Sequence, residues 1–499
     1  MTDANGRSAP EGRGLSVVTL RWIAALLLVL KLTLWLSAGA FMDETYYWIW
    51  GQHPALSYYD HPPLSAWLQG ISAQIFGWDT IGLRVMVMLS TIGDIAVLAL
   101  FARKLAPERW EQYFWVSVVL FLSTPIFFSM TGPALPDHML IVCSLASCYF
   151  FYVFFEQWRV DAQASYRNLY LGALCLGLAV LSKYNGAFLG FGVALFIVLS
   201  PRYRPLLRKP QLYLAGAISL VLQTPVIIWN ATERFASYGF ILKGRHQGVS
   251  ASSIGVIEFF LGAIVFLSPF LLPLVVRFIR APWKKSAQRP LGFEHLVFLV
   301  STLTMFVVSF FTTVLFHWNL VAYVAMLPFL GLYLRSRRLL IAQAVFGGLF
   351  LAATIFNYAV VPITAVFADG DEASAWVYDW SDVAAHVRSV QASHPSQFIA
   401  GSDYTVASLL AYALKDKDVT SLSQATDEYD YWFNPELHKG QNAILVDDRW
   451  RALSPYMSNS FKKLTLIEQV PVVRFGKLLN TVQIYYAEGF DPTAAEAVK

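Results

Sequence analysis

Charge is scarce in this sequence of 499 residues. Asp, Glu, Lys and Arg together make up 14% of the chain, whereas a soluble domain usually contains about 25% of them. Hydrophobic residues account for 56% of the chain, and the mean hydropathy is +0.50. This composition excludes an ordinary soluble protein and indicates a chain that crosses a membrane many times. No nucleic-acid partner is expected.

Cysteine is scarce as well. The three cysteines, Cys143, Cys148 and Cys175, all lie within apolar stretches, where a free cysteine behaves as a small hydrophobic residue. Their number and placement give no indication of a disulfide framework or of a cysteine-based metal cluster. An internal repeat of the kind found in transporters is not visible either.

Long apolar stretches, in contrast, fill the chain up to about residue 358. They predict a polytopic α-helical membrane protein with about 11–13 transmembrane helices. The eleven predicted spans are 16–36, 83–101, 113–130, 139–155, 169–181, 186–199, 212–229, 254–276, 296–315, 318–334 and 339–358. The fifth and sixth are shorter than the roughly 20 residues that a bilayer requires, and only Lys183, Tyr184 and Asn185 separate them.

Basic residues fall almost entirely on alternate connections, for example 103–109, 202–209, 277–289 and 335–338. Because cytoplasmic loops are enriched in Lys and Arg, this pattern places the N-terminus in the cytoplasm. Residues 1–14 are predicted to be a disordered cytoplasmic lead, and 15–359 the transmembrane domain. Its loops 38–79, 131–138 and 230–253 then lie on the outer face, and an odd number of spans places the C-terminal segment outside.

The composition changes at about residue 360. Residues 360–499 contain 18 acidic and 11 basic residues and no long apolar stretch. Short apolar runs at 397–400 and 443–446 predict buried strands, and 381–391 and 405–414 have helical spacing. Residues 464–486 predict a closing hairpin. The C-terminal segment is therefore predicted to be a soluble α/β domain.

Acidic residues gather in the first outer loop. Asp43 and Glu44 precede a run of four Tyr and Trp residues, which is typical of an interfacial helix. Further on, Tyr59, Asp60 and His61 precede two prolines that restrict the backbone. The alternatives remain open: Asp43 could simply cap its helix, and Asp60 and His61 could be solvated in an ordinary turn.

Other ionisable residues are predicted on the same face. Asp137 and His138 stand at the mouth of the fourth span, where Asp137 could also be an N-cap. Lys183 lies between two short spans, where ionisable residues are usually functional or paired, although its side chain could instead snorkel to the interface. Arg245 belongs to the loop 230–253, where it could be solvated, and His317 faces the same side.

Carboxylates on one wall of an outer pocket, and cations on the other, suit a lipid-linked phosphosugar. A carboxylate can take the proton of an acceptor hydroxyl as it attacks the anomeric carbon, and Lys or Arg can stabilise the departing phosphate. No cofactor is firmly implied. A divalent metal remains open because Asp43, Asp60, Asp137 and His138 are suitable ligand types, although their spacings form no recognised metal motif.

These motifs resemble those of a known family, the GT-C glycosyltransferases of the protein mannosyltransferase and aminoarabinose transferase superfamily. The resemblance is carried by Asp43-Glu44, Tyr59-Asp60-His61-Pro62-Pro63-Leu64, Leu135-Pro136-Asp137-His138, Leu181-Ser182-Lys183 and His317-Trp318-Asn319-Leu320. In the C-terminal segment, Gly401-Ser402-Asp403-Tyr404 and Tyr429-Asp430-Tyr431-Trp432 look like the bacterial branch that modifies lipopolysaccharide, including rhizobial core galacturonosyltransferases.

The resemblance implies a GT-C fold with a C-terminal periplasmic α/β domain. It implies that Asp43 is the catalytic carboxylate, that Lys183 holds the lipid phosphate, and that Arg245 is its arginine partner. The other residues expected to bind substrate are Glu44, Tyr59, Asp60, His61, Asp137, His138 and His317. Aminoarabinose transferases often have Lys where this chain has His61, which argues against aminoarabinose as the sugar.

The predicted protein is an inverting glycosyltransferase of a bacterial inner membrane. It would move a monosaccharide, with galacturonic acid as one candidate, from a polyprenyl-phosphate donor to lipopolysaccharide core or lipid A on the periplasmic face, in contact with membrane lipids. The alternatives are an enzyme that resembles protein O-mannosyltransferases and a transporter of lipid-linked sugars. A transporter would be expected to carry titratable residues at the midplane of several spans.

Overall fold

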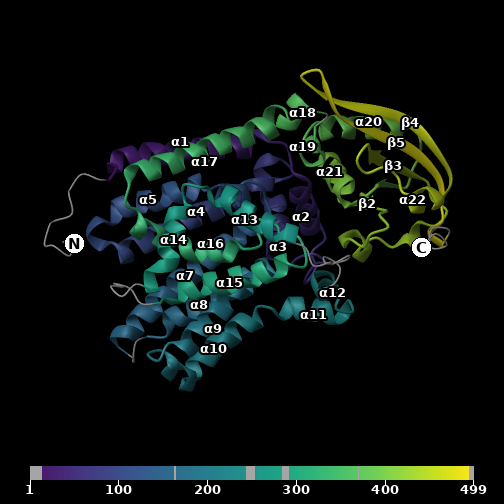
Figure 1. Cartoon of the computed structure of the whole chain (residues 1–499). Coiled ribbons are helices and arrows are strands. Elements are labelled where there is room, and N and C mark those ends of the chain that lie inside the picture. The colour runs from purple at the N-terminus through teal and green to yellow at the C-terminus, as the bar shows by residue number, and fades with distance from the viewer. Residues whose placement is uncertain (1–13, 162–164, 243–252, 284–290, 369, 494–499) are drawn as a thin grey trace.

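Helices dominate the computed structural model, which describes residues 14–161, 165–242, 253–283, 291–368 and 370–493. Figure 1 shows a large bundle of helices, with the five-stranded sheet of the C-terminal segment at one end. Helices α2 (Met42–Gln52) and α3 (Leu64–Phe76) lie between the two parts. The predicted lead, residues 1–14, falls outside the described residues except for Gly14.

The predicted apolar spans are helical. Four helices are long and apolar enough to cross a membrane by length and composition: α1 (Val17–Ser37), α4 (Thr80–Leu105), α7 (Asp137–Val160) and the segment Arg337–Val360, which contains α17 (Arg337–Ile355). Two bent helix pairs raise that number to six if each pair is one span. The remaining spans correspond to α5 (Trp110–Ser123) with α6 (Pro125–Met130), α8 (Arg167–Ser182), α9 (Ala187–Leu199), α15 (Phe293–Ser309), and α16 (Leu320–Met326) followed by a 3₁₀ segment (Leu327–Tyr333).

The predicted span 254–276 is interrupted by a sharp bend. The segment forms α13 (Ser253–Leu267) and α14 (Leu272–Arg280), which meet at an angle of 109°. Ser268 has a positive φ of 75° between them, and Pro269 and Pro273 follow, which cannot donate a helical hydrogen bond. The predicted span 212–229 is bent by 49° between α10 (Pro210–Val221) and α11 (Thr224–Thr232).

Polar residues mark the ends of the long helix α4. Asp79 precedes it, and the Asp79 side chain accepts a hydrogen bond of 2.7 Å from the backbone N–H of Gly82. Arg103 and Lys104 occupy its last turn. Both positions suit the helix dipole, which favours negative charge at the N-terminus and positive charge at the C-terminus. Local chemistry therefore sets the limits of this helix.

The first outer loop, 38–79, contains a helix at its start, α2, where one was expected, and a second helix, α3. Helices α2 and α3 pack against each other through glycine: a Cβ atom added to Gly70 would lie 2.4 Å from the carbonyl oxygen of Gly51. Helix α2 also packs against α21 (Tyr404–Leu414) of the C-terminal segment. Two segments more than 350 residues apart in the sequence thus meet at α2.

The C-terminal segment is an α/β domain, as predicted. Its sheet has the order β2-β1-β3-β5-β4, in which β1 pairs in parallel with β2 and β3, and β5 pairs antiparallel with β3 and β4. The strands are β1 (Phe398–Gly401), β2 (Thr420–Ser421), β3 (Ala443–Asp448), β4 (Phe461–Arg474) and β5 (Lys477–Phe490). The helices are α18 (Ile363–Phe367), α19 (Glu372–Ala375), α20 (Trp380–Ser393), α21 and α22 (Pro455–Asn459).

The predicted closing hairpin is β4–β5. Phe475 and Gly476 connect the strands with φ values of 47° and 72°. Positive φ at both central residues is the geometry that matches the twist of a hairpin, and glycine adopts it at little cost. Valine, isoleucine and leucine side chains of this hairpin contribute to the core shared with α20 and α21.

Candidate active site

Helix α2 carries the two acidic residues of the first motif in its first turn. Phe41 precedes the helix with extended backbone, and its N–H donates to Oε2 of Glu44 at 3.2 Å. Acidic residues are favourable in a first helical turn because of the exposed N–H groups there. The Asp43 side chain is half-buried, whereas that of Glu44 is fully buried. The two neighbours therefore have different environments.

Glu44 forms a buried ion pair with Arg84 of α4. Nη2 of Arg84 lies 2.8 Å from Oε2, and its Nε lies 2.9 Å from Oε1. Arg84 also donates to the carbonyl oxygens of Trp35, Ala38 and Gly39. Because both carboxylate oxygens already have partners, the geometry favours a role for Glu44 in positioning α2 over direct contact with substrate.

The same carboxylate reaches the second outer loop. The backbone N–H of Ala134 donates to Oε1 of Glu44 at 2.9 Å. Ala134 is three residues before Asp137, the first residue of α7. The ion pair thus connects the end of α1, the start of α2, helix α4 and the segment that leads to Asp137.

Asp137 and Lys183 form a second buried ion pair. Nζ of Lys183 lies 2.8 Å from each carboxylate oxygen of Asp137, and both side chains are about 5% exposed or less. Oγ of Ser182 donates to the carbonyl oxygen of Pro136 at 2.6 Å, which brings the end of α8 to the start of α7. His317 is an electrostatic neighbour of Asp137. The structure therefore brings these three predicted residues together.

His138 points in a different direction. Its Nδ1 lies 3.0 Å from Oγ of Ser90 in α4, and the side chain is buried. These contacts place His138 in the packing between α4 and α7. Its predicted contact with substrate stays a prediction.

The segment that contains Tyr59, Asp60 and His61 lies against α2 and the C-terminal domain. The Tyr59 ring lies 4.7 Å from that of Phe240 and 5.8 Å from that of Tyr431. His61 is 5% exposed, and its ring lies 5.6 Å from that of Tyr47. Aromatic rings therefore surround this corner.

Asp43 and Asp60 approach a common side chain, Tyr404 of α21. Burial raises the pKa of Tyr404 above its usual range, and the negative charges of Asp43 and Asp60 raise it further. The Tyr404 ring lies 4.6 Å from that of Tyr46 in α2. The C-terminal domain thus contributes to the surroundings of the predicted catalytic carboxylate.

Sequence reasoning did not assign roles to three residues of this region. Arg84 is a basic residue within the predicted span 83–101, and such a residue is usually paired. Tyr404 and Glu428 lie in or beside two motifs that carried the resemblance to the bacterial branch, but the sequence did not show that they meet α2. Arg245, by contrast, lies outside the described residues.

Among the residues that the structure describes, no group of three or more His, Cys, Asp and Glu side chains is arranged to hold a metal ion. Lys183 already binds Asp137, so a phosphate at this place would share Lys183 with that carboxylate. Asp43 and Asp60 are the predicted carboxylates that lie near Tyr404 of the C-terminal domain.

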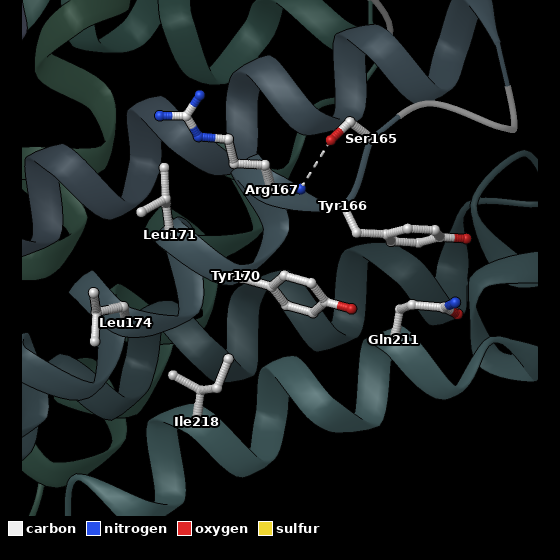
Figure 2. Close-up of a pocket in the computed structure, with 8 residues that line it drawn as sticks. All are labelled: Ser165, Tyr166, Arg167, Tyr170, Leu171, Leu174, Gln211 and Ile218. Carbon is white, nitrogen blue, oxygen red and sulfur yellow. Dashed lines mark hydrogen bonds between the residues drawn. The ribbon is translucent and has the colours of Figure 1, made fainter.

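A hollow of about 580 Å³ lies elsewhere, between the beginnings of α8 and α10. Figure 2 shows residues that line it, with Tyr166 and Gln211 on the right, Leu174 on the left and Ile218 at the bottom of the view. Lys183 directly follows the other end of α8, which has 16 residues and is therefore about 24 Å long. The hollow is thus separate from the residues described above.

Comparison with known proteins agrees with this architecture. Residues 60–229 match the family described as dolichyl-phosphate-mannose-protein mannosyltransferase. The structure is similar to that of ArnT from Cupriavidus metallidurans bound to undecaprenyl phosphate, with a TM-score of 0.63 and 14% sequence identity over 94% of this chain and 98% of that chain. The chain has the GT-C fold.

The apo state of the same ArnT gives the same TM-score of 0.63, with 15% identity and equal coverage. In sequence, the chain is 25% identical over 418 residues to the lipid A galacturonosyltransferase RgtD of Rhizobium johnstonii. The aligned region covers 79% of this chain and 83% of the relative. The resemblance to GT-C glycosyltransferases that modify lipopolysaccharide, inferred from the motifs, is therefore confirmed.

Proposed function

We propose that this GT-C protein is an inverting glycosyltransferase that moves a monosaccharide from a polyprenyl-phosphate donor to lipopolysaccharide core or lipid A. The observation that carries the proposal is the position of Asp43: it is half-buried, it lies with Asp60 close enough to Tyr404 to raise the pKa of that side chain, and its helix is stabilised by the Glu44–Arg84 pair. The similarity to RgtD and the fold shared with ArnT support the substrate class.

In the proposed reaction, the Asp43 carboxylate accepts the proton of an acceptor hydroxyl. The hydroxyl oxygen attacks the anomeric carbon from the side opposite the phosphate, and a new glycosidic bond forms as the bond between carbon and phosphate oxygen breaks. The electron pair of that bond stays on the polyprenyl phosphate. Since phosphate is a good leaving group, Lys183 and Arg245 need only stabilise its charge.

Galacturonic acid is the first sugar to test because RgtD is described as a galacturonosyltransferase. A uronic acid would require an additional cation near the sugar, and the candidates are Arg234, Lys243 and Arg245. The proposed location is a bacterial inner membrane, with the N-terminus in the cytoplasm and the catalytic face and C-terminal domain in the periplasm. This orientation is supported by the alternate placement of basic connections.

The decisive experiment is mass spectrometry of lipid A and core oligosaccharide from cells that lack the protein. The cells are complemented with wild type, with Asp43→Asn, or with the control Asp382→Asn, whose side chain is 66% exposed on α20. Loss of one sugar mass, restored by wild type and the control but not by Asp43→Asn, is expected. Full restoration by Asp43→Asn would remove Asp43 as the base.

A protein acceptor is the second candidate, because the family that matches residues 60–229 is described as a protein mannosyltransferase. An unchanged glycolipid profile together with loss of sugar from membrane or secreted proteins would favour it.

A further inference from the structure

In addition to α21, the C-terminal domain contacts the candidate active site through one short 3₁₀ segment, Glu428–Tyr431. The backbone N–H of Glu428 donates to the hydroxyl of Tyr46 in α2 at 2.8 Å. The Glu428 side chain in turn accepts a hydrogen bond of 2.5 Å from the backbone N–H of Tyr59. One residue of the C-terminal domain thus bonds both the helix that carries Asp43 and the loop that carries Asp60.

The segment itself has a fixed local geometry. Asp427 precedes it, and its carboxylate accepts hydrogen bonds from the N–H of Tyr429 and the hydroxyl of Ser421. The Asp430 side chain accepts from the N–H of Asp427 at 2.9 Å. These bonds join the segment to the end of β2, so the position of Glu428 relative to the sheet is set within the C-terminal domain.

Neighbouring contacts strengthen the same junction. Oγ1 of Thr45 donates to Oγ of Ser408 in α21 at 3.1 Å. The rings of His53 and Trp432 stack with centroids 4.4 Å apart. Every one of these contacts joins the loop 38–79 to the C-terminal domain, and Glu428 is the buried acidic residue among them, with 1% of its surface exposed.

Burying a carboxylate is unfavourable unless it serves as a hydrogen-bond acceptor. Burial raises the pKa of Glu428 well above its usual range; the bond from Tyr59 opposes this rise, and the nearby charges of Asp60, Asp427 and Asp430 add to it. A leucine of similar size would avoid this desolvation. The presence of an acidic residue here therefore needs an explanation, and the structure offers one: the carboxylate accepts the hydrogen bond from the N–H of Tyr59.

We infer that Glu428 is a positioning residue, which holds the Tyr59–Asp60 loop against α2 so that the C-terminal domain completes the active site. The inference rests on the proposed glycosyl transfer. It assigns the domain a part in the geometry of transfer itself, in addition to any contact with the acceptor.

The test compares Glu428→Gln and Glu428→Leu in the full-length protein reconstituted in lipid vesicles. Gln keeps a side-chain oxygen that can accept from Tyr59, whereas Leu leaves this N–H without its acceptor. Glu436→Leu, at an exposed position of the same domain, is the matched control. Hydrogen–deuterium exchange of residues 57–62 and the kcat and KM of sugar transfer are measured for each variant.

Glu428→Leu is expected to speed exchange of residues 57–62 at least fivefold and to lower kcat at least tenfold, with the donor KM within threefold of wild type. Glu428→Gln and Glu436→Leu should stay within threefold of wild type in both measurements. Unchanged exchange in Glu428→Leu would overturn the contact, and faster exchange with unchanged kcat would overturn its role in transfer.

A Gln variant as defective as Leu would show that the negative charge matters rather than the acceptor, and this too would overturn the inference. Failure of the proposed function looks different. Wild type would then transfer no sugar to any glycolipid acceptor, while the exchange measurement would still decide whether Glu428 holds the loop.

Discussion

At the scale of single residues, the side chain of Arg84 joins the end of α1 to the start of α2. It binds Glu44 and three backbone carbonyl groups, and both ionic side chains are at most 1% exposed. Removal of one partner from such a pair leaves an uncompensated buried charge, which typically costs about 3–5 kcal/mol. Arg84→Met is therefore expected to lower the melting temperature markedly in detergent.

The double variant Glu44→Gln/Arg84→Met removes both charges and should regain part of the loss. Arg103→Met, at the last turn of the same helix, serves as the control. If the double variant lost as much free energy of unfolding as the two single variants together, the two side chains would not be coupled and the pair would contribute little.

Asp447 in β3 gives a prediction for pH. Burial raises its pKa to about 6, the N–H of Leu453 opposes the shift, and the charge of Asp448 adds to it. A folded-state pKa above the unfolded value means that the folded protein binds the proton more tightly. Stability from this group is then present below about pH 4 and is lost as the pH rises towards 6.

Asp447→Asn cannot titrate but keeps an oxygen that can accept from Leu453. Its melting temperature is expected to lack the decline that this carboxyl causes in the wild type between pH 4 and 6, while the exposed control Asp416→Asn keeps the wild-type profile. Thermal unfolding of the full chain across pH 4–7 checks this. Identical profiles for Asp447→Asn and wild type would contradict the assignment.

At the scale of elements, local patterns predicted the helices and the final hairpin well. An apolar run identifies a helix such as α1 because every residue of the run adds to the signal. Gly476 identifies the turn of the hairpin because the positive φ of the turn depends on the residue at that position. The bend of 109° after α13 was missed. A Pro-containing segment permits either a kink or a break, and tertiary packing decides which of these occurs.

Variants at the junction of α7 and α8 can distinguish a structural role of Lys183 from a catalytic one. Asp137→Asn and Lys183→Met each remove one partner of a buried pair, so each alone should reduce stability by about 3–5 kcal/mol. The double variant should regain most of that stability, since neither residue is then left charged. If Lys183 also holds the donor phosphate, the double variant remains inactive.

Melting temperatures and sugar transfer by the single and double variants check this prediction. Recovery of both stability and transfer in the double variant would show that the pair is structural, and Lys183 would leave the proposed mechanism. Recovery of stability alone would support its contact with phosphate.

At the scale of the whole molecule, the residues that build the site lie far apart in the sequence. Asp43 and Asp137 were predicted from outer loops, and the resemblance supplied their roles. The contacts of Glu428 with Tyr46 and Tyr59 could not be predicted, because they join residues more than 360 positions apart. Periodicity describes neighbours along the chain, and it carries no information on how a soluble domain docks on a membrane domain.

Orientation in the membrane is a property of the whole chain as well. The distribution of basic connections predicts that residues 335–338 lie in the cytoplasm, and the eleven predicted spans would then put the C-terminal domain in the periplasm. Ser336 and Ser389 are both exposed, one before α17 and the other on α20. A cysteine at either position is therefore accessible to a thiol reagent from its own side of the membrane.

Ser389→Cys is expected to react with a membrane-impermeant maleimide once the outer membrane is permeable. Ser336→Cys should react only after the inner membrane is opened. The natural cysteines give little background, because Cys143 and Cys148 are buried and Cys175 is partly buried. The reverse pattern would place the C-terminal domain in the cytoplasm, and Asp43 with it, since α2 packs on α21. A periplasmic transfer to lipopolysaccharide would then be impossible.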